Sequence, residues 1–335
     1  MRLTPMSIVD LKLDFKRSRP LDIIAVGNAN IDITLYVNRV PGPDEAEESL
    51  NLVVSGGGAA SNFAIAASRM GCRVGFIGCI GSDDYGKLLL QEFKSEGVDV
   101  SRVQVSTSKH TGLVLIIVEP DGTRRMIAFR GANLDLDIER VDDEYFKSAK
   151  IIHIASIKPE MAYNTVVKAV KTQTIISYDP GSIAAKQGLN ALKHILEKTT
   201  ILFLNQRELE KLVGSRDVYS AIKILDLGVK IVALKMGEKG SILLTRNSII
   251  HIPPYKPKVI VDTTGAGDVY AAALISSIIK GRSLIESGLI ATIAAGLKVS
   301  KPGARKGLPY ESEVYSIFKS IGSELKRQVV VKPIQ

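Results

Sequence analysis

Strand-like and helix-like stretches take turns along most of this chain, an order that few folds accommodate. The apolar runs include LDIIAVG at 21–27, RVGFIG at 73–78, TIISYD at 174–179 and ILFLN at 201–205, with helical patterns between them. The runs are apolar throughout rather than at every second residue, which is typical of strands buried on both faces. The sequence therefore predicts a doubly wound α/β fold, with a mainly parallel sheet and helices on both faces.

Two segments interrupt this alternation. Residues 33–55 continue the first strand as a further extended segment, and residues 109–132 read as a hairpin around Pro120 to Thr123. We expect a small inserted β-sheet that covers a ligand pocket as a lid, although a rigid structural flap or a dimer contact fits the same pattern. The expected organisation is an N-terminal extension at 1–20 and one α/β domain at 21–327 that contains the insert.

Composition narrows the classes of partner. The formal net charge is +9, but Lys and Arg are scattered among Asp and Glu, so we expect no nucleic-acid partner. No segment is long and apolar enough to predict a membrane span. Cys72 and Cys79 lie among apolar residues, which predicts buried thiols and a cytoplasmic protein.

The strongest motif is DTTGAGD at 262–268, between an expected strand end at Val261 and a helix expected to begin at Asp268. Glycines at 265 and 267 allow a tight turn whose N–H groups point to one spot. There the positive end of the helix can stabilise charge on a transferring phosphoryl group. Asp268 would then accept the proton of a substrate hydroxyl, and the alternative is that it only caps the helix.

A second motif is GGGAASN at 56–62, before a helix expected at 63–70. Its glycines would let the backbone approach a ligand, and Asn62 would point its amide into the cleft. The alternative is that glycine serves only the geometry of a strand-to-helix turn.

A third motif is NQRE at 205–208, directly after an apolar strand. Asn205 and Glu208 would lie one helical turn apart on the same face, which suits a magnesium ion held through water beside nucleotide phosphates. The same spacing is also that of a capping box.

Together with GNANID at 27–32, these motifs resemble the ribokinase-like, or PfkB-type, family of sugar and nucleoside kinases from about Leu21 to Pro309. The resemblance implies ATP as co-substrate, Mg²⁺, and a monovalent cation such as potassium. It implies that Asp268 is the catalytic base, that Gly265, Ala266 and Gly267 form the anion hole, and that Asn30, Asp32, Gly57, Gly58, Asn62 and Asn133 bind the acceptor. It places Asn205, Glu208, Lys235, Gly237 and Gly240 at the nucleotide, Glu208 near magnesium, and Asp262 and Thr264 at the monovalent cation.

The chain departs from ribokinases at two places. Ala59 stands where those enzymes usually have a lysine, and the residues from Ser156 to Lys158 lack a carboxylate expected there, so ribose is not the automatic acceptor. Three arginines of the hairpin offer a basic edge that could recognise an anionic substrate, and the alternative is that they are solvent-exposed. These are Arg124, Arg125 and Arg130.

The expected function is ATP-dependent phosphorylation of a hydroxyl on a small sugar or polyol. A nucleoside kinase and a kinase of a sugar phosphate are the alternatives within the class. A non-catalytic sugar-sensing protein is the alternative from another class, and it would have no need of Asp268. An exposed edge of the lid favours a homodimer.

Overall fold

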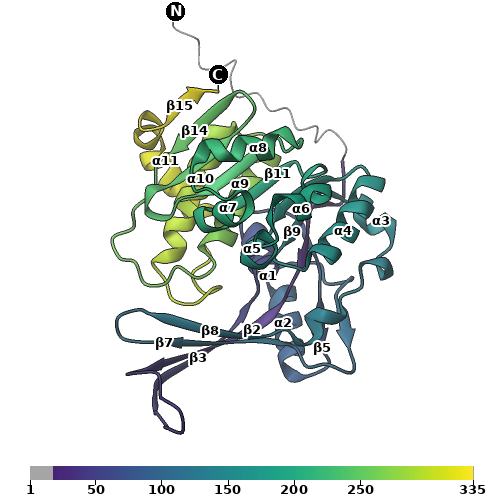
Figure 1. Ribbon diagram of the computed structural model, residues 1–335, viewed down its shortest axis with the longest axis vertical. Coiled ribbons are helices and arrows are strands. Elements are labelled where there is room, and N and C mark those ends of the chain that lie inside the picture. Colours follow the sequence, from purple (N-terminus) through teal and green to yellow (C-terminus); the bar gives the residue numbers. More distant parts are fainter. Residues whose placement is uncertain (1–17, 335) are drawn as a thin grey trace, which may run out of the picture.

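A computed structural model describes residues 18–334 (Figure 1). Most of the N-terminal extension predicted at 1–20 therefore lies outside the described residues. Within residues 18–334, no helix combines the length and the apolar character that a membrane crossing requires.

The main sheet has nine strands in the order β15-β14-β13-β12-β11-β10-β9-β1-β4 within the described part of the chain. Six of them are parallel, and the last three along the chain continue the sheet in antiparallel fashion. This confirms the predicted mainly parallel α/β fold. The strands are β1 Leu21–Gly27, β4 Val74–Ile77, β9 Ala149–Ala155, β10 Ile175–Asp179, β11 Ile201–Asn205, β12 Ile231–Lys235, β13 Ser241–Leu244, β14 Ser248–Ile252 and β15 Val330–Pro333.

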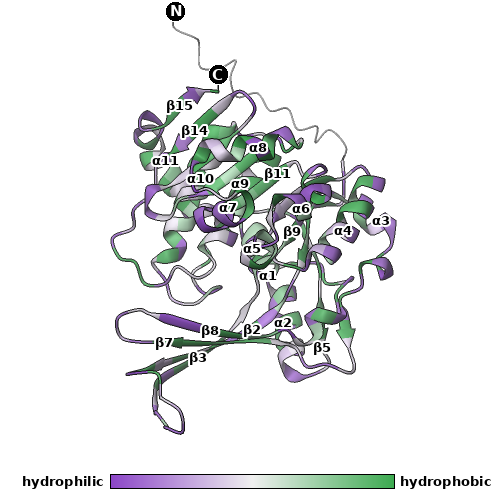
Figure 2. Ribbon diagram, viewed as in Figure 1, coloured by the Kyte–Doolittle hydropathy of each residue, from purple (hydrophilic) through white to green (hydrophobic). Residues whose placement is uncertain are grey.

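Helices cover both faces of this sheet. Each face of the sheet carries its own hydrophobic core. In β1, Ile23 belongs to one core and Ile24 to the other, because successive side chains point to opposite faces of a strand. The central strands are accordingly hydrophobic along their length (Figure 2). One layer has α1 Ala59–Arg69, α2 Asp84–Ser95, α9 Ala266–Ile279, α10 Leu284–Val299 and α11 Glu311–Arg327; the other has α3 Asp143–Lys147, α4 Pro159–Lys171, α5 Gly181–Ala185, α6 Gly188–Leu196, α7 Gln206–Val213 and α8 Ile222–Asp226.

A second sheet projects from the main body (Figure 1). Its order is β3-β2-β7-β8, and we call it the lid sheet. Its strands are β2 Asn30–Val37, β3 Ser49–Gly57, β7 Gly112–Val118 and β8 Arg124–Phe129, so the predicted inserted sheet and its hairpin are confirmed. Two short strands, β5 Cys79–Gly81 and β6 Gln104–Ser106, and the 3₁₀ helices η1 Gly131–Asp135, η2 Ile138–Arg140, η3 Val218–Ala221 and η4 Gly237–Lys239 complete the described elements.

The structure corrects three predictions about where strands and helices lie. No strand leads into the DTTGAGD motif, because residues 253–265 form an irregular segment whose three prolines lack the N–H donors that a sheet needs. The helix that follows begins at Ala266, so Asp268 is its third residue. Helix α1 begins at Ala59 rather than Phe63, which makes Asn62 the fourth residue of that helix.

Candidate active site

Polar side chains gather where three neighbouring parallel strands end. Asp179 is the last residue of β10, Asn205 of β11 and Lys235 of β12, and Asn205 lies opposite Lys235 in the strand register. Open α/β sheets bind ligands at this edge, because the connections there leave a crevice. The predicted nucleotide residues therefore lie where the fold provides a site.

The predicted anion hole, Gly265 to Gly267, lies at the start of α9. Gly265 is the N-cap with φ of 78°, and an added Cβ there would lie 3.0 Å from the carbonyl oxygen of Ala304. Glycine is therefore required at this position. Among residues 18–334, the N–H groups of Gly265 and Gly267 have no partner, whereas that of Ala266 is bonded to the oxygen of Thr263 at 3.2 Å. Two of the three predicted amides are thus available to an anion.

Asp268 does not cap this helix, so the capping alternative is wrong. Its Oδ2 accepts a hydrogen bond of 3.0 Å from Nδ2 of Asn62 in α1. Burial raises the pKa of Asp268 to about 7; Asp179 and Asp32 add to this rise, and Asn62 and Lys235 oppose it. A carboxylate with this pKa can take a proton near neutral pH.

Asn62 is oriented by a residue that the sequence did not indicate. The buried Arg305 donates from Nε to Oδ1 of Asn62 at 3.3 Å, which leaves the Nδ2 of Asn62 to face Asp268. Arg305 also donates to the carbonyl oxygen of Gly57, to Ser61 and to Glu92. Arg305 therefore links the glycine turn before α1, through Asn62, to the carboxylate of Asp268.

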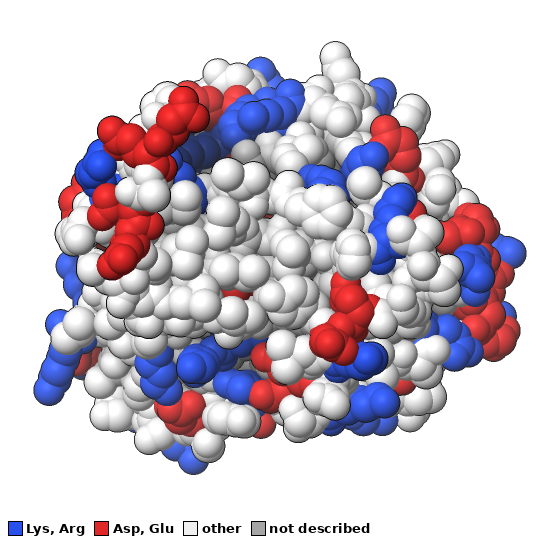
Figure 3. Space-filling view, turned by 90° about the horizontal axis from the view of Figure 1, so that it is seen from below, with Lys and Arg blue, Asp and Glu red and all other residues white. Residues whose placement is uncertain are grey.

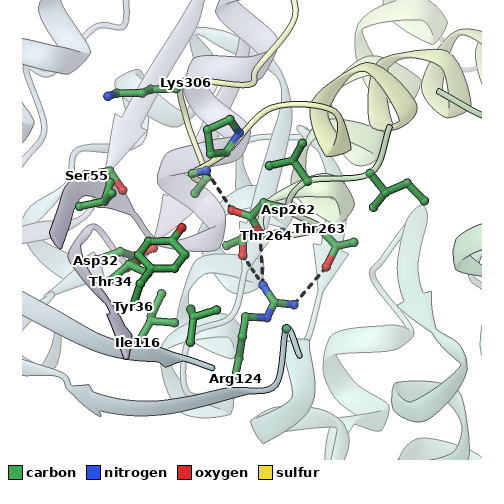
Figure 4. Close-up of a pocket in the computed structure, with 18 residues that line it drawn as sticks. Asp32, Thr34, Tyr36, Ser55, Ile116, Arg124, Asp262, Thr263, Thr264 and Lys306 are labelled. Atoms are coloured by element: carbon green, nitrogen blue, oxygen red, sulfur yellow. Dashed lines mark hydrogen bonds and ion pairs between the residues drawn. The ribbon is translucent and has the colours of Figure 1, made fainter. Parts of the chain in front are cut away.

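Asp32 presents a second carboxylate, close enough to Asp268 to raise the pKa of that residue. It is buried, and an added Cβ on Gly57 would lie 2.3 Å from its carboxylate, so only glycine fits beside it. Burial raises the pKa of Asp32 to about 6, Arg305 opposes this rise, and Asp262 adds to it. The carboxylate lines a pocket, where it can accept hydrogen bonds from hydroxyl groups (Figure 4).

The side chain of Asn133 forms hydrogen bonds within the protein and does not point into the pocket with a free amide group. Its Nδ2 donates to Oδ1 of Asn30 at 2.7 Å and to the carbonyl oxygens of Ala29 and Arg130, and its Oδ1 accepts from the N–H of Ala29 at 3.0 Å. All of its amide atoms are thus engaged within the protein. Asn133 therefore fixes the side chain of Asn30. The predicted acceptor residue Gly58 has φ of 96° and packs against the carbonyl oxygen of Asn28.

Asn205 and Glu208 form the capping box that the sequence left as an alternative. Asn205 Oδ1 accepts from the N–H of Glu208 at 2.9 Å, and Glu208 Oε2 accepts from the N–H of Asn205 at 2.8 Å. Burial and then Asp179 raise the pKa of Glu208. Within residues 18–334, no group of three or more His, Cys, Asp or Glu side chains could hold a metal. The residues fit a magnesium ion bound mostly by nucleotide phosphates and water, with Glu208 nearby.

Asp179 is a site residue that the sequence analysis missed. Its Oδ2 accepts from Nζ of Lys235 at 2.7 Å, and both side chains are largely buried. Burial alone would lower the pKa of Lys235, but Asp179 and Glu208 raise it above its ordinary value. An added Cβ on Gly267 would lie 3.2 Å from Nζ of Lys235, so this ammonium group lies beside the anion hole.

Two other predicted nucleotide residues are glycines in the turn after β12. Gly237 is exposed with φ of 60°, and Gly240 is buried against the carbonyl oxygen of Ile252. Lys235 faces the anion hole, whereas the turn itself lies beyond it. Contact of this turn with a base or a ribose remains a prediction.

A pocket of about 300 Å³ lies between the lid sheet and the loops at 260–264 and 302–306 (Figure 4). Asp32 supplies a carboxylate, and Tyr36 and Ile116 supply apolar surface. Arg124 enters from β8, and its guanidinium donates to Thr264 at 2.6 Å and Thr263 at 3.0 Å. The lid sheet is therefore bonded to the segment that leads into the anion hole.

The predicted monovalent cation at Asp262 and Thr264 does not fit these surroundings. The two carboxylate oxygens of Asp262 accept from the N–H groups of Thr264 and Gly303, each at 2.9 Å, and Arg124 lies 3.3 Å from Oδ1. The carbonyl oxygen of Asp262 accepts from Nζ of Lys298 at 2.9 Å. The oxygen atoms expected to bind a cation thus already bind two cationic side chains.

Comparison with known proteins agrees with this geometry. The model of the family described as pfkB family carbohydrate kinase matches residues 21–311. An uncharacterized sugar kinase of Archaeoglobus fulgidus is 31% identical over 72% of this chain and 97% of its own length, and an ATP-dependent ribose-1-phosphate kinase of Halopiger xanaduensis is 30% identical over 84% and 93%.

Among solved structures, a ribokinase of Arabidopsis thaliana complexed with ribose and ATP superposes with a TM-score of 0.82 at 26% identity, over 89% of this chain and 99% of that one. The resemblance drawn from the motifs is confirmed. A buried carboxylate in the first turn of a helix, a lid sheet over a pocket and the match over most of the chain lead to one conclusion: the chain belongs to the pfkB family of carbohydrate kinases.

Proposed function

We propose that this sugar kinase transfers the γ-phosphoryl group of ATP to a hydroxymethyl group of a small sugar or polyol, with Asp268 as the base. The observation that carries the proposal is the position of Asp268. It is the third residue of α9, bonded to Asn62, with the anion hole one residue before it and Lys235 beside Gly267.

The proposed roles follow from these positions. Asp32 and Asn30 bind hydroxyl groups of the acceptor, and Asp268 orients the reacting hydroxyl and accepts its proton. The N–H groups of Gly265 and Gly267, with the ammonium group of Lys235, stabilise the negative charge of the γ-phosphoryl group during transfer. Magnesium, when bound with ATP near Glu208, neutralises charge on the phosphates.

The test is ATP-coupled turnover by the purified protein with magnesium across sugars, keto sugars, polyols, sugar phosphates and nucleosides. We expect turnover of one class, reduced by at least about 10²-fold in Asp268→Asn, since a general base contributes about that much or more. Binding of sugars without turnover of any acceptor would contradict the proposal and support a sensor.

A sugar phosphate is the second candidate, because the exposed Lys306 lines the pocket and forms no ion pair within residues 18–334. The side chain of Arg130, before η1, likewise has no ion-pair partner there, whereas Arg124 and Arg125 are paired. The relative from H. xanaduensis is named for a phosphorylated acceptor. Lys306→Ala and Arg130→Ala should raise KM for a sugar phosphate and leave KM for the matching free sugar unchanged.

The outer face of the lid sheet supports a homodimer. Leu50, Leu52 and Val54 alternate along β3 with pocket-lining residues, and Ile127 and Phe129 alternate along β8 with Arg124 and Ala128. These five apolar side chains are all exposed, and the molecule seen from the lid side shows a broad uncharged area (Figure 3). An apolar face of this extent on a sheet with two free edge strands fits a second copy of the chain.

The two cysteines support a reducing, cytoplasmic location. Cys72 and Cys79 are both buried and unpaired in the structure. Burial raises the pKa of both thiols, which keeps them in the unreactive form.

A further inference from the structure

Lys298, in the last turn of α10, is a fully buried lysine whose ammonium group faces backbone oxygens. Its Nζ donates to the carbonyl oxygen of Asp262 at 2.9 Å and to that of Lys301 at 3.4 Å. A buried ammonium group without a paired carboxylate is costly, and burial lowers the pKa of Lys298 while Asp262 opposes this effect. Because burying this ammonium group costs free energy, we expect it to have a function in the site.

The two bonded carbonyl groups lie in the two loops that hold the anion hole. Asp262 belongs to the segment at 253–265 that leads into α9, and Lys301 belongs to the loop after α10. The same loops meet where Gly303 donates to Asp262 and where Gly265 packs on Ala304. Asp262 in turn accepts from the N–H of Thr264, the residue before Gly265.

A single positive charge among backbone carbonyl oxygens is also what a bound monovalent cation provides. Arg124 and Lys298 already bond to Asp262 and Thr264, so Asp262 and Thr264 do not fit a free cation. Lys298 brings the charge on its own side chain, and its chain of contacts runs from the ammonium group through Asp262 and Thr264 to the N-cap of α9.

We propose that the ammonium group of Lys298 is a built-in monovalent cation that positions the anion hole, so that this kinase needs no potassium for turnover. Lys298 is a positioning residue, since it acts through the backbone oxygens of Asp262 and Lys301 that its ammonium group holds. The inference rests on the proposed function only in its kinetic readout. The bonds of Lys298 also explain how the segment at 253–265, which is not part of a strand, holds Gly265 in place.

The first test needs no variant. Turnover of the wild-type protein is measured at constant ionic strength with tetramethylammonium, sodium, potassium or ammonium chloride. We expect kcat to agree within about twofold among the four salts, because the cationic position is filled by the protein. Activation by potassium or ammonium well beyond that range would overturn the inference while leaving the kinase activity established.

The second test removes the charge in two ways. Lys298→Ala leaves space for an ion, and Lys298→Met fills that space with an apolar chain of similar length. We expect kcat to fall about tenfold or more in both variants with little change in KM for the acceptor, and potassium or ammonium to restore kcat in Lys298→Ala but not in Lys298→Met. An unchanged kcat in Lys298→Ala would overturn the inference.

Lys168 offers a matched control. It is also a buried lysine that donates to two backbone carbonyl oxygens, those of Glu139 and Val141, at 3.1 and 2.7 Å, but it lies in α4, outside the site, and its ammonium group is also 3.5 Å from the exposed carboxylate of Glu139. Lys168→Ala should lower the unfolding temperature without changing kcat or its response to potassium.

Thermal unfolding decides the same question when no acceptor has been found. Potassium should raise the unfolding temperature of Lys298→Ala relative to sodium and tetramethylammonium, and should leave the wild type and Lys168→Ala unchanged. A rise of equal size in the wild type would show a free cation site and overturn the inference, whatever the outcome of the acceptor panel.

Discussion

At the residue scale, Asp268 is surrounded by charges of both signs. Asp179 and Asp32 favour its protonated form, while Lys235 and the amide of Asn62 favour its ionised form. Burial outweighs the favourable contacts, so the pKa of the base lies near 7 in the protein without substrates. The carboxylate is thus costly to ionise, as many functional groups are.

This cost predicts that Asp268→Asn stabilises the fold at alkaline pH. The pKa of Asp268 is higher in the folded state than in the unfolded state, so the folded state gains stability from the protonated group at low pH and loses it as pH rises toward 7. An asparagine keeps the neutral form at every pH and can still accept from Asn62. We expect the variant to be about 1 to 3 kcal/mol more stable at pH 8 by urea unfolding, after a discount for partial exposure of the carboxylate.

The difference between variant and wild type should shrink toward zero only as pH falls below 3.8, the ordinary pKa of the aspartate, because the wild-type carboxyl group is then protonated in both states. Asp121→Asn is the control, since Asp121 lies exposed in the lid hairpin and its pKa is lowered by contacts with Thr123. A variant at 268 that is less stable than the wild type at pH 8 would show that the buried carboxylate is stabilising.

Some of these residues could be predicted and others could not. Asp268 and Asn62 each lie in a glycine-containing motif, and the fold brings them to 3.0 Å although 206 positions separate them. Arg305, Asp179 and Lys298 lie in no motif, and their roles depend on contacts that only the packed chain creates. Asp179 had one signal, a carboxylate at the end of an apolar strand.

At the element scale, the lid sheet follows from the same patterning as the main sheet. The hairpin of β7 and β8 was predictable because two apolar runs flank a Pro-Asp-Gly-Thr turn, in which Gly122 has φ of 82°. The parallel pairing of β2 with β7 was not predictable, because these strands are far apart in the chain. The irregular segment at 253–265 was mistaken for a strand because it contains Val259, Ile260 and Val261, all of which are exposed.

Arg124 connects the lid sheet to the loop before the anion hole, and this predicts a role in binding the acceptor. Its contacts with Asp262, Thr263 and Thr264 hold the lid over the pocket. Arg124→Ala should raise KM for the acceptor several-fold, because the pocket would close less completely. Stability should change by less than about 0.5 kcal/mol, since the ion pair is partly exposed.

Arg125→Ala is the matched control for this variant. Arg125 is the next residue of β8, so its side chain points to the other face, where it pairs with Glu119 of the same hairpin. Its loss should leave KM unchanged. Equal effects of the two variants on KM would contradict a role of Arg124 in lid closure.

At the scale of the whole molecule, the two-core architecture leaves the apolar outer face of the lid sheet uncovered. Ile127 is 66% exposed and Leu50 is 63% exposed. Burial of this face in a dimer predicts a mass near twice that of the chain in sedimentation or light scattering. Ile127→Lys should shift the protein toward the monomer, because a charge in an apolar interface is costly.

Val105→Lys is the control, since Val105 is 51% exposed on β6, outside the lid sheet. It should leave the mass unchanged. A wild-type protein that remains a monomer at the highest concentrations used would refute the dimer, and the lid face would then be a solvent-exposed surface of the monomer.

The measurement that tests the central claim most directly is kcat/KM as a function of pH for the wild type and Asp268→Asn with one good acceptor. The account predicts that kcat/KM of the wild type rises with pH and levels off above an apparent pKa near 7, because the base must be ionised to accept the proton. It also predicts that Asp268→Asn is lower by at least about 10²-fold at the plateau. Turnover by Asp268→Asn within a few-fold of the wild type, with the same rise near pH 7, would contradict the assignment of Asp268 as the base.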